Sequence, residues 1–277
     1  MTAGDEVTLN ANETIIAKTM HGHCRNIIIT FANQKGGVGK STLCALFAHY
    51  LTMMGVKVLV VDADRQQTLS QLRSLNLLGA ASKEAGENTA QKKPDKRYVN
   101  ILTGKLWDIE RLAIRESEEV AAHIRRLKEF DGVVLVDSPG SLTENGMVPL
   151  VVLSDLIFCP FFYEMQTLMS TANFIVFIQK LHKRFPDMTA ELILMPNRYN
   201  PTVGTSKERK RIDETVLVLR KYGKVAPDIK TSSRIQHYNT TEFNLWQKEA
   251  CHTAFDFILE ETGLAALFDE WHNLADD

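Results

Sequence analysis

Short apolar runs rich in β-branched residues alternate along this chain with longer stretches of helical periodicity. Residues 27–31 and residues 56–61 read as buried strands, and residues 41–54 between them follow the repeat of a helix. The apolar face of this helix would consist of Leu43, Leu46, Phe47, Tyr50 and Leu51. Two strands joined by a helix form a βαβ unit, whose strands are parallel because the connection crosses back over the sheet.

The alternation continues through most of the remaining chain. Further strands are expected at residues 133–136, 156–159 and 192–195. Helices are expected near residues 107–129, 164–183, 206–222 and 252–273. Strands that are apolar on both faces need helices on both sides. The pattern therefore predicts a three-layer α/β fold, with a mostly parallel, twisted sheet flanked by helices.

Two segments depart from this alternation. Residues 1–25 are polar and weakly patterned, and we expect them to form a flexible N-terminal arm. Residues 79–97 are small, polar and charged, which is typical of a flexible insertion. The rest of the chain, residues 26–277, is expected to form one domain around this insertion.

Composition narrows the class of protein. The 277 residues carry a formal net charge of −2, so attraction to nucleic acid or anionic lipid would have to come from a local patch. The four cysteines show no C-x-x-C spacing, which favours a reducing compartment over a disulfide scaffold. Since the sequence shows neither a signal peptide nor an apolar run long enough to span a bilayer, we expect a soluble, cytoplasmic protein.

The strongest chemical signal is the glycine-rich stretch FANQKGGVGKST at residues 31–42. It follows a predicted strand and opens a predicted helix, which is the context of a phosphate-binding P-loop. Backbone N–H groups of the glycines would approach the phosphates, Lys40 would reach the β- and γ-phosphates, and Ser41 would coordinate Mg²⁺. With ATP and Mg²⁺ as cofactors, the predicted binding residues are Gly36, Gly37, Val38, Gly39, Lys40, Ser41 and Thr42.

The loop departs from the standard motif, because Gln34 stands where a glycine is usual and Lys35 follows it. In K-G-G-V-G-K-S-T this extra lysine resembles the deviant Walker A motif of the ParA/MinD family of ATPases. The resemblance implies a P-loop NTPase fold and an ATP-bound homodimer. In that dimer Lys35 would contact the nucleotide of the partner subunit and act as a catalytic residue together with Lys40. Dimerisation would then report whether ATP or ADP is bound.

The segment after the second strand is similar to the first switch of this family, D-x-D-P-Q. Here it reads Asp62-Ala63-Asp64-Arg65-Gln66. By that analogy Asp64 is a catalytic residue that positions the attacking water in a slow hydrolysis, and Asp62 lies near the magnesium ion. The alternative is that both acids cap the following helix. Arg65 replaces the usual proline, which leaves the rigidity of the switch open.

Two further strand ends carry candidate side chains. Asp137 precedes Ser138-Pro139-Gly140 and resembles a Walker B aspartate, which would hold Mg²⁺ through a water molecule. Asn197 follows the strand at 192–195, and the resemblance implies that it lies beside the adenine base. An asparagine at a strand end is also common where no ligand binds.

Basic residues are concentrated near the end of the chain. Residues 207–234 hold nine lysine and arginine side chains against four acidic ones, in a chain that is slightly acidic overall. This local excess favours binding to the DNA backbone without sequence preference, and a solvated helix face is the alternative. The candidate DNA contacts are Lys207, Arg209, Lys210, Arg211, Arg220, Lys221 and Arg234.

The last residues of the chain help to choose a branch of the family. Residues 260–277 are acidic, whereas a MinD-like membrane anchor would be a basic amphipathic helix, so no membrane partner is expected. The ParA-like branch remains. It implies a switch that dimerises on ATP, binds non-specific DNA and so associates with the nucleoid. A ParB-like adaptor or another activating protein would release it by stimulating hydrolysis, in DNA partition or conjugative-element maintenance.

Two other functions remain compatible with the sequence. One is a biosynthetic P-loop ligase of the dethiobiotin-synthetase type, which would need a small-molecule acceptor and no DNA. The other is a ParA-like positioning ATPase whose cargo is not DNA.

Overall fold

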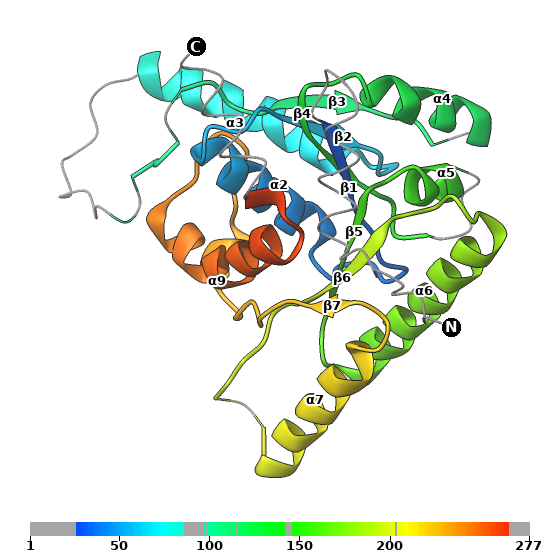
Figure 1. Ribbon diagram of the computed structural model, residues 1–277. Helices are drawn as coiled ribbons and strands as arrows, with labels where there is room; N and C mark the ends of the chain where they lie inside the picture. The colour runs from blue at the N-terminus through cyan, green and yellow to red at the C-terminus, as the bar shows by residue number, and fades with distance from the viewer. Residues whose placement is uncertain are drawn as a thin grey trace, which may run out of the picture.

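The computed structural model describes residues 26–85, 97, 99–102, 104–114, 116–141, 146–202 and 204–265. These residues form a seven-stranded parallel sheet flanked by helices, which confirms the predicted α/β fold (Figure 1). The strand order is β3-β2-β4-β1-β5-β6-β7. The strands are β1 (Asn26–Phe31), β2 (Val58–Asp62), β3 (Asp108–Arg111), β4 (Gly132–Asp137), β5 (Leu156–Phe161), β6 (Glu191–Pro196) and β7 (Lys224–Val225).

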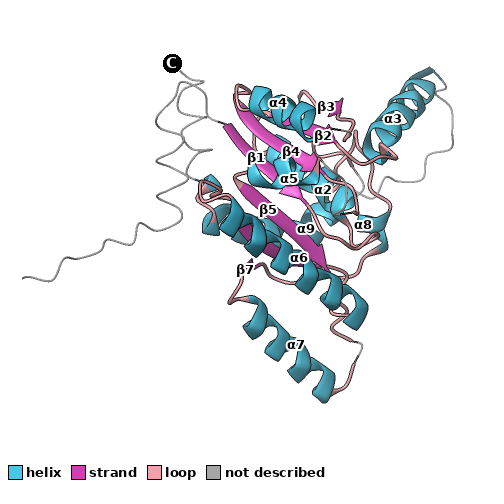
Figure 2. Ribbon diagram, turned by 90° about the vertical axis from the view of Figure 1, so that its right-hand side faces the viewer, coloured by secondary structure: helices cyan, strands magenta, loops and turns pink. Residues whose placement is uncertain are grey.

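The helices cover both faces of this sheet, as Figures 1 and 2 show from two directions. They are α2 (Lys40–Met53), α3 (Thr68–Ala85), α4 (Ser117–Leu127), α5 (Met147–Val152), α6 (Met165–Arg184), α7 (Ser206–Leu219), α8 (Ser233–Gln236) and α9 (Leu245–Glu261). Helices α2 and α9 pack on one face, and α4, α5 and α6 pack on the other. Helix α7 lies beyond the β7 edge and extends away from the sheet.

The period-two alternation of side chains explains why each central strand is apolar throughout. On β4, Val133 and Leu135 pack in the cluster with α2 and α9, whereas Val134 and Val136 pack in the cluster with α4 to α6. Phe31, Phe47 and Phe158 meet edge to face in the first cluster, with ring centroids 5.1 to 6.4 Å apart. The central strands are therefore buried on both faces and hold their carboxyl ends in fixed positions.

Some predicted boundaries differ from the structure. The helix expected over 107–129 was wrong in its first part, because residues 108–111 form β3, which pairs with β2, and α4 begins only at Ser117. Helix α9 begins at Leu245, earlier than predicted, where Asn244 and Gln247 form a capping box. Helix α3 continues through residues 79–85 of the expected insertion. The N-terminal arm, residues 86–96 and residues 266–277 lie outside the described residues.

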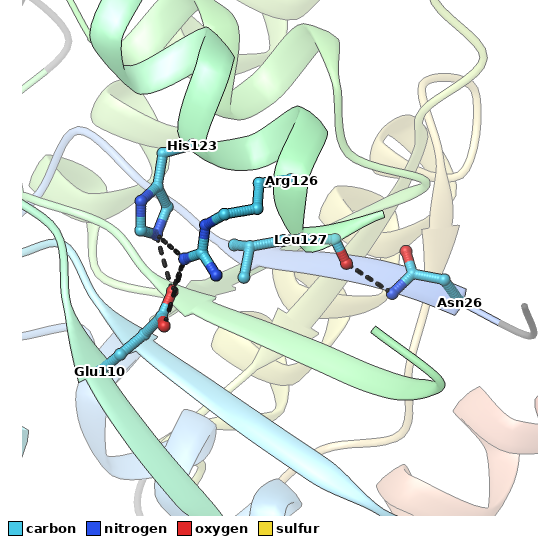
Figure 3. A network of polar contacts seen from close by, with 5 residues as sticks. All are labelled: Asn26, Glu110, His123, Arg126 and Leu127. Atoms are coloured by element: carbon cyan, nitrogen blue, oxygen red, sulfur yellow. Dashed lines mark hydrogen bonds and ion pairs between the residues drawn. The ribbon is translucent and has the colours of Figure 1, made fainter. Parts of the chain in front are cut away.

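The two edge strands are short and carry charged side chains. On β3, Glu110 accepts hydrogen bonds from His123 Nε2 at 2.7 Å and Arg126 Nη2 at 3.1 Å, and both donors lie on α4 (Figure 3). Asn26 of β1 donates to the carbonyl of Leu127, which ends the same helix, at 2.9 Å. At the opposite edge Lys224 of β7 pairs with Glu191 at 3.2 Å. These polar contacts fix α4 and the outer strands to the sheet.

Candidate nucleotide-binding site

The glycine-rich loop joins β1 to α2 at the carboxyl edge of the sheet. Gly37 and Gly39 have φ angles of 76° and 102°, which residues with a Cβ rarely adopt. A Cβ at Gly39 would also collide with the side-chain nitrogen of Asn197, whereas a Cβ at Gly36 would meet no atom within 4 Å. The loop shape thus depends on glycine at 37 and 39, and open space lies beside Gly36.

Lys40 is the first residue of α2 and is 7% exposed. Its Nζ donates a hydrogen bond to the carbonyl of Lys35 at 3.4 Å. Burial lowers the pKa of Lys40, and the nearby carboxylates of Asp137 and Asp64 oppose this shift. The ammonium group therefore lies between the loop backbone and the predicted magnesium ligands, where a phosphate group could replace the weak contact to Lys35.

Asp62 and Asp137 end the neighbouring strands β2 and β4 and are both fully buried. Oδ2 of Asp62 accepts a hydrogen bond from the Ser70 amide at 2.8 Å. Among the described residues, Oδ1 of Asp62 and both carboxyl oxygens of Asp137 have no hydrogen-bond partner. Burial raises the pKa of Asp137 to about 7. The Ser41 hydroxyl, which lies nearby but does not meet hydrogen-bond geometry, and Lys40 oppose the rise, and Asp62 adds to it. Buried carboxyl oxygens without partners are costly, so a cation would stabilise this arrangement.

These residues fit a magnesium ion that also uses phosphate ligands. Mg²⁺ is a hard cation that is commonly held by one or two carboxylates together with water and substrate phosphates. In the described part of the chain, no group of three or more His, Cys, Asp or Glu side chains could hold a metal ion. Ser41, Asp62 and Asp137, the magnesium ligands predicted from the sequence, would hold the ion together with the phosphates of a nucleotide, and this assignment stays a prediction.

Comparison with known proteins agrees with this geometry. A protein-family model described as an AAA domain matches residues 26–191, which is more than half of the chain. The chain belongs to the ParA/MinD family of P-loop ATPases. The septum site-determining protein MinD of Helicobacter pylori is 27% identical over 205 residues, which cover 70% of this chain and 74% of that protein. An uncharacterised protein of Methanocaldococcus jannaschii is 30% identical over 151 residues, which cover 48% of this chain and only 58% of that protein's length.

Two solved structures of similar fold each cover at least 85% of this chain. An ATP complex of McdA from Cyanothece has a TM-score of 0.62 at 17% identity and covers 87% of this chain and 97% of that one. A plasmid partition protein from Borrelia burgdorferi bound to AMPPNP has a TM-score of 0.54 at 19% identity and covers 85% and 98%. At these identities the likeness shows the P-loop α/β fold.

In this ParA/MinD-family chain, the segment 62–66, which resembles the first switch of the family, leads from the end of β2 through a turn towards α3. Oδ1 of Asp64 accepts a hydrogen bond from the Gln66 amide at 2.8 Å, and Gln67 has a positive φ of 50°. Asp62 likewise accepts from Ser70 in the first turn of α3. The capping alternative is therefore present for Asp62, which bonds to an amide of α3, whereas Asp64 bonds only within the turn before this helix. Asp64 retains an oxygen for other contacts and lies close enough to Lys40 to affect its pKa.

Lys35 sits on a rigid part of the loop. Its amide donates to Asn33 Oδ1 at 3.1 Å, and the buried Asn33 donates in turn to the Pro160 carbonyl at 2.7 Å. The Lys35 side chain is partly exposed and, among the described residues, makes no ion pair or hydrogen bond. The backbone of Lys35 is thus fixed to β5 while its ammonium group stays available.

Asn197 has a role that the sequence did not indicate. Its Nδ2 donates to the Val38 carbonyl at 2.9 Å and its Oδ1 accepts from the Arg198 amide at 2.8 Å, so its amide group holds the loop in place. Asn197 also lines a pocket of about 220 Å³ beside the loop, so the adenine contact stays a prediction. Sequence reasoning missed most of this lining, which consists of Gly39, Thr42, Asn197, Arg198, Lys230, Ser232, Ile235 and Gln236.

The predicted DNA contacts lie on α7, just after it and on α8. Lys207, Lys210 and Arg211 are exposed on the first turns of α7. Arg220 and Lys221 lie at the other end of this helix, about 20 Å away at 1.5 Å of rise per residue. Arg209 donates to the Pro201 carbonyl at 3.2 Å, and Arg234 belongs to α8. None of the described helices is long and apolar enough to cross a membrane.

Proposed function

We propose that this ParA/MinD-family ATPase is a nucleotide-gated DNA-binding switch that serves DNA partition or conjugative-element maintenance. In this proposal the ATP-bound chain forms a homodimer that binds DNA without reading its sequence. A ParB-like adaptor or another activating protein stimulates a slow hydrolysis and thereby releases the DNA. ATP binding and hydrolysis shift the equilibrium between dimer and monomer, and the energy of ATP is not used to make another product.

The observation that supports this proposal best is the contrast between the two lysines of the loop. Lys40 is buried beside Asp137, which suits a phosphate bound within the same subunit. Lys35 is held by its backbone through Asn33 but offers a partly exposed ammonium group with no partner among the described residues. Because its backbone is held in place and its ammonium charge is not neutralised by a described residue, Lys35 is suited to contact a phosphate of the nucleotide that is bound to a second subunit.

Within one subunit the residues would have separate tasks. The amides of the glycine loop and Lys40 bind the phosphates, while Ser41, Asp62 and Asp137 hold Mg²⁺. The metal, when bound, offsets the charge that develops on the transferred phosphoryl group. Asp64 orients the attacking water. Because a partly exposed carboxylate is a weak base near pH 7, this arrangement supports slow hydrolysis until a partner completes the site.

The two alternatives make different demands on the same site. A biosynthetic ligase of the dethiobiotin-synthetase type needs a small-molecule acceptor and would gain nothing from Lys35. A positioning ATPase with a non-DNA cargo would keep the ATP-dependent dimer but would not need the basic side chains of α7 and α8.

Binding to random-sequence duplex DNA at fixed moderate salt would test the proposal, with Mg-ATP, Mg-ADP or no nucleotide. The variants are Lys35→Ala and Asp64→Ala, with Lys180→Ala on the exposed side of α6 as a matched control. We expect binding that requires ATP, is lost in Lys35→Ala and persists in Asp64→Ala and Lys180→Ala. DNA binding that is equal with ATP, ADP and no nucleotide would overturn the proposal. Light scattering would then test for an ATP-dependent dimer, which the ligase does not need.

A further inference from the structure

The side-chain amide of Asn33 joins three parts of the fold. Its Oδ1 accepts from the Lys35 amide at 3.1 Å, while its Nδ2 donates to the Pro160 carbonyl at 2.7 Å and to the Thr171 hydroxyl oxygen at 3.1 Å. Asn33 is 1% exposed and Thr171 is fully buried. Because the oxygen and the nitrogen of this amide both have partners, the hydrogen bonds determine how it is oriented. The P-loop, β5 and α6 are thus connected through one buried side chain.

Asn33 continues the contact between β1 and β5 beyond the end of β1. Just before it, the Ala32 amide donates to the Phe158 carbonyl at 2.8 Å. Carbonyl groups two residues apart on a strand point to the same side, so Pro160 offers the next acceptor towards β1. The side chain of Asn33 binds this acceptor in place of a backbone amide. The P-loop therefore leaves the sheet from a point that is fixed to β5.

Thr171 extends this network to α6. It lies on the buried face of the helix, together with Phe174 and Ile178. A hydroxyl group in such apolar surroundings is unfavourable unless it forms a hydrogen bond, and a valine side chain has a similar shape without this requirement. The contact with Asn33 satisfies the Thr171 hydroxyl. The hydroxyl at this position therefore ties α6 to the loop.

The network holds Lys35 directly and Lys40 only indirectly. Asn33 accepts from the amide of Lys35, whereas Lys40 is the first residue of α2. The two lysines are linked by the weak contact from Lys40 Nζ to the Lys35 carbonyl at 3.4 Å, which a phosphate could replace. Neither Asn33 nor Thr171 lines the 220 Å³ pocket beside the loop. A change in this network should therefore displace Lys35 and leave nucleotide binding within the subunit nearly intact.

We propose that Asn33 and Thr171 are positioning residues that place Lys35 for its contact with the nucleotide of a second subunit. The inference rests on the function proposed above, in which that contact builds the ATP-bound dimer. It gives α6 a part in dimerisation, although Thr171 lies 138 residues from Asn33 in sequence. A charged hydrogen bond depends on distance and direction, so the dimer is weakened when the base of Lys35 is no longer held.

Two substitutions of Thr171 separate the hydrogen bond from packing. Thr171→Val keeps the shape of the side chain and removes the acceptor, whereas Thr171→Ser keeps the acceptor and removes a methyl group. Sedimentation velocity in Mg-AMPPNP would measure the dissociation constant of the dimer, and calorimetric titration would measure Mg-ADP affinity. We expect Thr171→Val to weaken the dimer about fivefold or more and Thr171→Ser to stay within about twofold of wild type. Mg-ADP affinity should stay within about twofold of wild type in both variants.

Thr167 provides a matched control. It is buried on the same face of α6, one turn before Thr171, and among the described residues its hydroxyl makes no hydrogen bond to the loop. Thr167→Val should leave the dimer within about twofold of wild type. Asn33→Ala removes the anchor of Lys35 itself and should weaken the dimer at least as much as Thr171→Val. Thermal denaturation would establish that each variant is folded.

The outcomes distinguish this inference from the proposed function. If Thr171→Val forms the dimer as wild type does, or if Thr171→Ser is impaired as much as Thr171→Val, the network does not position Lys35, although the switch function stands. An equal loss of Mg-ADP affinity in Thr171→Val would also overturn the inference, because the network would then support the whole loop. If the wild-type protein forms no dimer in Mg-AMPPNP, the proposed function fails and this inference fails with it.

Discussion

Asp62 and Asp137 are register partners at the carboxyl ends of β2 and β4, so two buried carboxyl groups lie next to each other beneath the P-loop. Burial is the largest cause of the raised pKa at each of them. In the nucleotide-free chain these two buried carboxyl groups therefore destabilise the folded state, and a magnesium ion would relieve this destabilisation.

Asp137→Asn should stabilise the nucleotide-free protein and weaken Mg-ATP binding. The folded pKa of about 7 is above the ordinary value of 3.8, so wild-type stability falls as pH rises between these values. At pH 8 the buried Asp137 is ionised in the folded protein and destabilises it fully. Replacing this carboxylate with an amide should therefore raise the free energy of unfolding by roughly 1–4 kcal/mol. Mg-ATP affinity should drop about tenfold or more.

Urea denaturation and calorimetric titration would measure these two effects. Asp187→Asn, in the exposed turn after α6, is the matched control and should change neither quantity. Wild-type affinity of Asp137→Asn for Mg-ATP would contradict the assignment of Asp137 as a metal-holding residue.

Gly39→Ala should destabilise the loop, whereas Gly36→Ala should not. Position 39 combines a φ of 102° with a collision against Asn197, while position 36 has free space and no positive φ. We expect a loss of about 1–3 kcal/mol for Gly39→Ala and less than about 0.5 kcal/mol for Gly36→Ala, measured by urea denaturation. Equal losses at both positions would show that the loop has another shape.

Asn197→Ala should cost about 1–3 kcal/mol, because the buried carbonyl of Val38 loses its donor. Asn197→Asp should cost more, since a carboxylate cannot donate to that carbonyl and adds a buried charge. Thermal denaturation would measure both. If Asn197→Ala leaves stability unchanged but abolishes the preference for ATP over GTP, base recognition and not loop support is its role.

Stability should fall in mild acid through His49. Burial is the main cause that lowers its pKa to about 4, while Nδ1 accepts from Trp107 at 3.1 Å and Nε2 contacts the Asn239 carbonyl at 2.8 Å. The unfolded chain therefore takes up a proton on this side chain between pH 6.5 and 4, and the folded chain does not. This difference should remove roughly 2 kcal/mol between pH 7.5 and pH 5.

His49→Gln can form both hydrogen bonds without titrating, so urea denaturation should show a flatter pH dependence for this variant than for wild type. Other groups that titrate in this range are common to the two proteins and cancel in the difference. Parallel pH profiles would rule out His49 as the source of the acid sensitivity.

The central part of the fold could be predicted because its signals are local and strong. Strands β1, β2 and β4 are apolar on both faces, and the P-loop combines three glycines with two lysines in register with a strand and a helix. Strand β3 could not be predicted, because its four residues include three charged ones and pair with β2 only through tertiary contacts. The loop-supporting role of Asn197 was equally hidden, since its partner Val38 is more than a hundred residues away in sequence.

The outer strands also bear on how copies of this protein can meet. An unpaired strand edge is a template for strand pairing between chains, which leads to aggregation. Here one edge is a four-residue strand whose Glu110 is bound to His123 and Arg126, and the other is a two-residue strand tied by Lys224 to Glu191. Neither offers a long, flat, apolar edge to a neighbour. Among the described residues, the two edge strands are therefore poor templates for strand pairing between neighbouring chains.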